Sequence, residues 1–201
     1  MQFLIDPIQF GLFHTTIAEM IAVCFGLTSV WFMKKEHILV YPFGIVNVLI
    51  YVYICYAAGL YAYAGINGFY FIMSVYGWFN WLRKNKKADR IRITACSWKE
   101  LIIYILLTGI IFLLLRWALL LWTNSVVPAW DALTTSIYII GMWLLAMKKI
   151  ENWLFWIVGD IISVGLFAYE QLYFSCLQFS VFTIIAILGY REWKRKLSES
   201  P

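Results

Sequence analysis

Long apolar runs separated by short charged or turn-rich stretches make up most of this sequence. Each run supplies about the 20 residues that an α-helix needs to cross the roughly 30 Å apolar core of a bilayer. Residues 1–14 are too few to cross and are interrupted by Asp6, Pro7 and Gly11, so we expect an interfacial segment there. The pattern predicts seven transmembrane helices, at residues 15–33, 37–57, 61–81, 101–122, 131–147, 151–170 and 173–193.

The composition is typical of a membrane protein. Apolar and aromatic residues make up 63% of the 201 residues and charged residues 13%, whereas soluble domains have roughly 45–50% and about 25%. We therefore predict an all-α membrane protein with no room for a soluble catalytic domain. The sequence contains no GxxxxGK[ST], HExxH or GxSxG motif and no Cys/His cluster, so we expect no cofactor, no metal and no enzyme activity.

The basic residues indicate how the chain is oriented. Apart from Arg116, every Lys and Arg lies at the end of the seventh helix or in the loops after the first, third and fifth. The positive-inside rule then places the basic loop 83–100 and the C-terminal tail 194–201 in the cytoplasm, and the N-terminus outside. Anionic lipid at the inner membrane surface accounts for the net charge of +5, so we expect no nucleic-acid partner.

The chain repeats itself at a spacing of about 112 to 114 residues. The Met-Lys-Lys that begins at Met33 recurs at Met147, and the stretch that begins at Gly77 recurs in part from Gly189. The three-helix bundle at 15–82 is thus repeated at 131–193, and the linker helix at 101–122 lets both insert the same way up. This 3+1+3 parallel repeat is used by transporters whose substrate lies near mid-membrane, although simple duplication would leave the same pattern.

Polar residues at mid-depth are the first candidates for a site. Asp160 lies near the middle of its predicted helix, where a carboxylate costs at least about 2.5 kcal/mol unless it faces protein or water. Asn47 lies at a similar depth in the matching helix of the other bundle when the repeat is aligned with a one-residue gap. We predict that both face a binding site; an interhelical hydrogen bond worth only about 0.6 kcal/mol is the alternative.

Aromatic residues share the face of Asp160. Trp153, Trp156 and Asp160 are three and four residues apart, so they form one stripe of a helix that suits a flat cationic or hydroxyl-bearing solute. Trp153 would serve equally well as an interfacial anchor.

Further polar residues on the third and seventh predicted helices complete the candidate set. They are Asn67, Gln178 and Thr183, whose short donors and acceptors would fix a ribose or an amide. Thr183 would equally well bond back to its own helix.

Two motifs resemble the PnuC-type vitamin transporters, which are named for nicotinamide riboside uptake across the bacterial inner membrane. One is the run from Glu151 to Asp160, ENWLFWIVGD, and the other is Tyr76-Gly77-Trp78 with Trp81. The resemblance extends from Glu19 to Lys196. Asn67 and Asp160 stand where nicotinamide riboside carriers of the family have Gln and Asn.

This resemblance implies two three-helix bundles joined by a linking helix, similar to the sugar-transporting SWEET architecture, and assembly as a homotrimer. It also implies facilitated diffusion of a vitamin, with cytosolic phosphorylation trapping the product. The family includes thiamine and riboflavin carriers, and Asp160 fits the cationic rings of nicotinamide riboside and thiamine better than neutral riboflavin. A substrate-binding subunit of an ATP-driven importer is the alternative. The binding set carried over is Asn47, Asn67, Trp153, Trp156, Asp160, Gln178 and Thr183.

Overall fold

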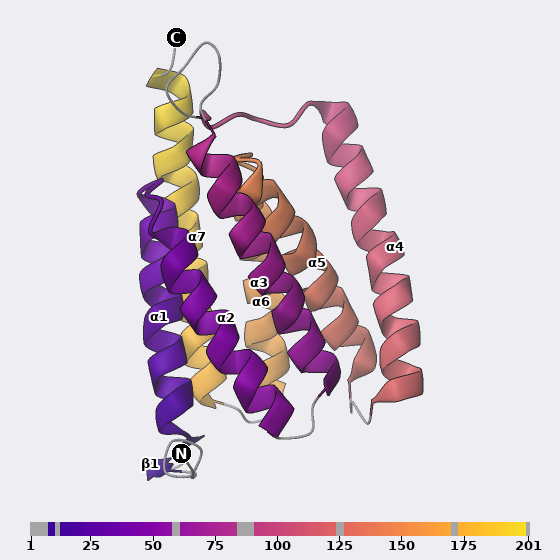
Figure 1. Cartoon of the computed structure of the whole chain (residues 1–201). Helices are drawn as coiled ribbons and strands as arrows, with labels where there is room; N and C mark the ends of the chain where they lie inside the picture. Colours follow the sequence, from indigo (N-terminus) through magenta and orange to yellow (C-terminus); the bar gives the residue numbers. More distant parts are fainter. Residues whose placement is uncertain are drawn as a thin grey trace.

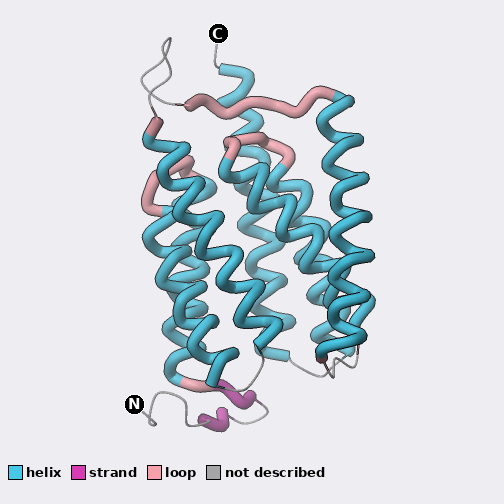
Figure 2. The backbone as a smooth tube through the Cα atoms, turned by 45° about the vertical axis from the view of Figure 1, so that its right-hand side comes forward, coloured by secondary structure: helices cyan, strands magenta, loops and turns pink. Residues whose placement is uncertain are grey.

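The computed structural model of this chain describes residues 8–10, 13–57, 61–83, 91–123, 127–169 and 173–199. Within these residues a short antiparallel hairpin precedes seven α-helices that run side by side (Figures 1 and 2). The hairpin pairs β1 (Ile8–Phe10) with β2 (Phe13–Thr15). The helices are α1 (Ile17–Lys34), α2 (Val40–Ala57), α3 (Tyr61–Leu82), α4 (Trp98–Trp122), α5 (Pro128–Ala146), α6 (Asn152–Tyr169) and α7 (Tyr173–Glu199).

A helix lies at each of the seven predicted positions, and most helix ends agree within three residues. The exception is α7, which continues through residues 194–199, where the sequence pattern predicted a tail. Arg195 bonds Glu192 at 2.9 Å and Glu199 at 3.2 Å. Such pairs one turn apart stabilise a helix in water, so α7 extends past the end of its apolar run.

Among the described residues, five helices are long and apolar enough to cross a membrane: α1, α2, α4, α5 and α6. Length and composition alone decide this property. The other two helices, α3 with 22 residues and α7 with 27, are each longer than at least four of these five and lie alongside them (Figure 1). The structure is therefore an all-α protein with several candidate membrane spans.

Six of the helices form a closed ring. In the order α1, α2, α3, α5, α6 and α7, each packs against the next, and α7 packs against α1. The remaining helix, α4, lies outside this ring against α5 (Figure 1). It begins with a capping box in which Ser97 and Glu100 satisfy each other's backbone N–H groups. Most of its apolar side chains are exposed, and Leu119 is buried.

Two tryptophans join the halves of the ring where α1, α3, α5 and α7 end, which we call the basic end because lysines and arginines gather there. The indole N–H of Trp81 on α3 donates to the carbonyl of Leu145 on α5 at 3.1 Å. The indole N–H of Trp193 on α7 donates to the carbonyl of Met33 on α1, also at 3.1 Å. Both indoles are buried, so these bonds join α3 to α5 and α7 to α1 away from water.

A buried lysine strengthens the same end. The ammonium of Lys148 bonds Glu36 Oε1 at 2.8 Å and the carbonyl of Ile91 at 2.9 Å, and lies 4.4 Å from the centre of a Trp81 ring. Lys196 on α7 bonds the other oxygen of Glu36 at 3.2 Å. Glu36 therefore links three parts of the chain: the loop between α1 and α2, helix α7, and the residues just after α5.

Candidate binding cavity

The helix ring encloses a cavity of about 1040 Å³. All six ring helices contribute lining residues. At the end opposite the basic end the lining includes Glu19 on α1 and Asp131 on α5, and towards the basic end it includes Met33 and Leu145. A space of this size accommodates a small organic molecule, because ligand pockets measure roughly 300–1,000 Å³.

The structure brings most of the predicted site residues to the wall of this cavity. Thr183 is the exception, since it does not line the cavity, and its hydroxyl donates to the carbonyl of Phe179 on its own helix at 2.9 Å. A threonine satisfied one turn back along its helix needs no further partner. Those on the wall are Asn47, Asn67, Trp153, Trp156, Asp160 and Gln178.

Asp160 faces inward, as its predicted role requires. It is 3% exposed and lines the cavity from α6. The hydroxyl of Tyr138 on α5 donates to Asp160 Oδ1 at 3.0 Å and lies 2.9 Å from the hydroxyl of Ser163. A buried carboxylate persists in apolar surroundings only with hydrogen-bonding partners or a compensating charge, and Tyr138 provides the first of these.

An aromatic wall lies beside this carboxylate. Tyr138 stacks on Trp156 with ring centres 5.2 Å apart and planes 30° apart, and on Phe179 at 6.4 Å and 25°. All three rings line the cavity. Within the described residues, the indole N–H of Trp156 is buried without a hydrogen-bond partner. The wall therefore presents flat aromatic faces to a ligand.

Trp153 has a different position from Trp156. It is fully buried, meets Trp193 edge-on at 5.6 Å, and packs on Gly189, where an added Cβ would overlap its ring. Although Trp153 borders the cavity, it mainly fills the space between α6 and α7. It forms the floor of the cavity near the basic end rather than an open stacking face.

The three predicted amides are each held by a hydrogen bond. Asn47 Nδ2 donates to the carbonyl of Ala22 on α1 at 2.7 Å. Asn67 Nδ2 donates to the carbonyl of Tyr63 on its own helix at 3.0 Å. Gln178 forms a side-chain hydrogen bond with Tyr51. These bonds fix the amides on the wall, at positions spread over α2, α3 and α7.

The charges on the wall are of one sign. Glu19, Asp131 and Asp160 contribute carboxyl groups, and the described lining residues include no Lys, Arg or His. The hydroxyl of Tyr63 donates to Asp131 Oδ2 at 2.8 Å. Electrostatic complementarity therefore favours cationic or neutral ligands and disfavours anions.

Sequence reasoning missed Tyr138, which is the direct partner of Asp160. It lies on a predicted helix among thirteen tyrosines in the chain, and no motif distinguishes it. Its position along the helix could have identified it, because Tyr138 and Asp160 both lie near the middle of neighbouring antiparallel helices.

A ring of helices long enough for a bilayer, around a cavity with an aromatic and acidic wall, defines a membrane protein built to hold a small organic molecule. Comparison with known proteins makes the class specific. A protein-family model described as nicotinamide mononucleotide transporter matches residues 16–195. The chain belongs to this family of membrane transporters, the PnuC family, whose members are transporters rather than enzymes.

Curated relatives cover most of the chain. The nicotinamide riboside transporter PnuC of Escherichia coli (strain K12) is 27% identical over 212 aligned positions, spanning 93% of this chain and 89% of the relative. The protein of the same name from Neisseria mucosa is 22% identical, over 87% of this chain and 71% of its own length. A solved structure described as the vitamin B3 transporter PnuC shares the fold, with a TM-score of 0.74, 21% identity and coverage of 92% and 83%.

Proposed function

We propose that this chain carries nicotinamide riboside, or a closely related cationic vitamin, across the bacterial inner membrane by facilitated diffusion. The observation that carries the proposal is the carboxylate of Asp160 on the wall of a ring-enclosed cavity beside the stacked rings of Trp156 and Tyr138. The relatives named as nicotinamide riboside transporters support the choice of substrate.

The chemistry of this vitamin fits the wall. Its flat, positively charged pyridinium ring would stack on Trp156, whose face attracts cations, and Asp160 would balance the charge. Asn47, Asn67 and Gln178 offer amide groups for the ribose hydroxyls and the carboxamide. A phosphorylated nucleotide fits less well, because three carboxyl groups and no basic side chain appear in the described lining.

Diffusion down a gradient accumulates a vitamin only if the product is removed, so we assign that step to phosphorylation in the cytosol. The absence of a nucleotide-binding motif from the sequence supports a carrier without its own energy source. The alternative, a binding subunit of an ATP-driven importer, would need a separate ATPase for transport.

We also propose that the fold is a SWEET-like 3+1+3 parallel repeat of seven membrane spans. With a shift of 112 residues, Trp81 corresponds to Trp193 and Met33 to Leu145, so the bond from Trp81 to Leu145 matches the bond from Trp193 to Met33. The same shift relates the tight contact of Tyr41 with Gly77 to that of Trp153 with Gly189. Two unrelated bundles would have no reason to share these pairs.

The shift of 112 also changes the expected pairing of polar residues. It aligns Asn47 with Gly159 rather than with Asp160, so the one-residue gap assumed from the sequence is not needed at this depth. Gly26 then aligns with Tyr138. In the first bundle an added Cβ on Gly26 would lie 3.0 Å from Asn47 Nδ2, and in the second an added Cβ on Gly159 would lie 2.5 Å from Tyr138. In the first bundle the larger residue of this pair, Asn47, is on the second helix, α2. In the second bundle the larger residue, Tyr138, is on the first helix, α5.

The basic end would face the cytoplasm, with the N-terminus outside, because lysines and arginines favour the inner side. The exposed apolar face of α4 would contact lipid or α4-bearing faces of neighbouring copies in a homotrimer. Crosslinking in native membranes tests the second possibility.

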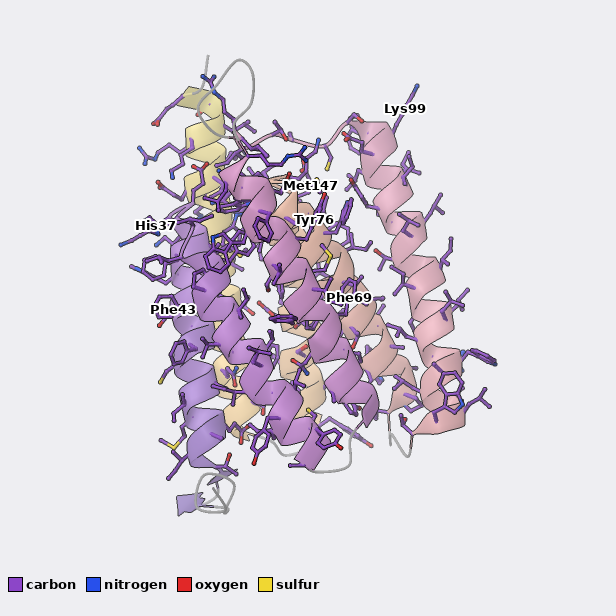
Figure 3. The ribbon with its side chains drawn as sticks, viewed as in Figure 1. His37, Phe43, Phe69, Tyr76, Lys99 and Met147 are labelled. Carbon is purple, nitrogen blue, oxygen red and sulfur yellow. The ribbon has the colours of Figure 1, made fainter. Side chains whose placement is uncertain are left out.

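Binding of the purified protein to nicotinamide riboside, thiamine and riboflavin tests the substrate by calorimetry. We expect the two cationic vitamins to bind more tightly than riboflavin. Asp160→Ala and Trp156→Ala should each weaken binding more than about tenfold, since each removes an interaction worth over about 1.4 kcal/mol. Lys99→Ala is the control, because Lys99 is exposed at the start of α4, away from the ring (Figure 3). Equal effects at all three positions would contradict this site.

Uptake by liposomes tests the mechanism. Purified protein alone should equilibrate the vitamin across the membrane without ATP or an ion gradient. Transport that requires an added ATPase would favour the importer subunit instead.

A further inference from the structure

Tyr138 connects the two chemical features of the cavity. Its hydroxyl donates to Asp160 Oδ1 at 3.0 Å, and its ring lies between those of Trp156 and Phe179. The ring lines the cavity from α5, whereas Asp160 and Trp156 project from α6. A change at Tyr138 therefore affects both the carboxylate and the aromatic wall.

The surrounding residues make room for this side chain. An added Cβ on Gly159 would lie 2.5 Å from Tyr138 Cε1 and 3.0 Å from its Cζ, closer than atoms in contact tolerate. Gly159 immediately precedes Asp160, so the close approach of α5 to α6 here places the tyrosine hydroxyl at the carboxylate. The residue 112 positions before Tyr138 is Gly26, so the aromatic wall stands on one side of the cavity.

We propose that Tyr138 is a positioning residue that gives the cavity its preference for cationic over neutral rings. The hydroxyl holds one carboxylate oxygen of Asp160 so that the other meets the charge of a ring stacked on Trp156. This inference rests on the proposed function and goes beyond it, because it assigns the charge preference to the orientation of Asp160 and not to its presence alone.

A purely structural role makes a different prediction. If Tyr138 only ties α5 to α6 through Asp160 and Ser163, removing its hydroxyl would lower stability and weaken all ligands alike. If it orients the carboxylate, removing the hydroxyl would weaken cationic ligands selectively. The ratio of two affinities separates these roles, whereas a single affinity does not.

Nicotinamide riboside and its reduced dihydro form supply the ligand pair. They have nearly the same shape, but the oxidised ring is positively charged and the reduced ring is neutral. We expect the wild-type protein to bind the cation more tightly. Tyr138→Phe keeps the ring and removes the hydroxyl, and it should reduce this preference about tenfold, the size expected for a lost hydrogen bond to a charged group.

A second background tests whether Tyr138 acts through Asp160. Asp160→Asn should itself abolish most of the preference, and adding Tyr138→Phe to it should change the ratio less than about twofold, because coupled residues are not additive. Tyr76→Phe is the matched control. Tyr76, labelled on α3 in Figure 3, also stacks on a tryptophan, Trp143, at 5.9 Å and 4°, but neither residue lines the cavity.

Three results would overturn the inference: an unchanged ratio in Tyr138→Phe, an equal loss in Tyr76→Phe, or additive losses in the double variant. If Tyr138→Phe does not fold, Gly159→Ala must displace the tyrosine ring and should reduce the ratio in the same way. A wild-type protein that binds neither ligand would overturn the proposed function together with this inference. A wild-type preference that survives Tyr138→Phe would overturn the inference alone.

Discussion

Replacing Lys148 by methionine should destabilise the protein far more than the same change at its neighbour Lys149. Lys148 is 4% exposed, and its ammonium contacts Glu36, the carbonyl of Ile91 and the ring of Trp81. Methionine preserves most of the apolar stem and removes the charge. Lys149 forms its ion pair with Glu100 at 3.2 Å, in a more exposed setting.

The magnitude follows from these surroundings. Removing one partner of a buried ion pair costs about 3–5 kcal/mol. Glu36 keeps its bond to Lys196 and its side chain is 23% exposed, so the loss for Lys148→Met should fall at or just below the lower limit of this range, at about 2–3 kcal/mol. The pair of Lys149 with Glu100 is more exposed, with side chains 19% and 41% exposed, and a surface pair contributes about 0–1 kcal/mol.

Thermal unfolding in detergent, followed by tryptophan fluorescence, measures the difference. For a chain of this size about 1 kcal/mol corresponds to roughly 2–4 °C, so Lys148→Met should lower the unfolding temperature by about 4–12 °C and Lys149→Met by at most about 4 °C. Equal shifts in the two variants would refute the view that burial of Lys148 makes this end of the ring rigid.

Two further predictions concern packing and ionisation. Gly189→Ala should destabilise the protein by about 1–3 kcal/mol in the same assay, since its Cβ overlaps the buried ring of Trp153. Gly65→Ala is the control and should cause no loss of stability, because a Cβ there meets nothing within 4 Å. Similar losses in the two variants would contradict the contact. Burial, together with the carboxylate of Glu151, raises the pKa of the Cys96 thiol to about 12. At pH 8 only about one part in 10⁴ is thiolate, so alkylation of Cys96 should be slow and speed up as pH rises; Glu151→Gln should lower the pKa and accelerate it, and an unchanged rate would count against the assignment.

Some features of this protein could be predicted from the sequence alone because the bilayer constrains them. A helix crossing needs a long apolar run, so the positions of the helices follow from hydropathy. A carboxylate in the middle of such a run must face protein or water, so the inward position of Asp160 could be predicted as well. The basic residues beyond 193 obscured the true end of α7, because a charged run reads as a tail even when pairs such as Glu192 with Arg195 keep it helical.

Side-chain roles were harder to predict. Trp153 and Trp156 share one face of α6, yet one is fully buried against α7 and the other lies on the open wall. Thr183 lies at a suitable depth but does not line the cavity. A helical stripe indicates which residues face the ring and does not indicate how deeply a neighbouring helix covers them.

The sequence by itself determined the class of protein, the positions of its helices, the basic end and the carboxylate at mid-depth, because each depends on the cost of placing polar groups in lipid. Only the tertiary structure decided which helices are neighbours and which side chains meet. Trp193 bonds a carbonyl 160 residues away, and Tyr138 bonds Asp160 across two helices. Such contacts depend on the rotation and separation of packed helices, which local hydropathy does not determine.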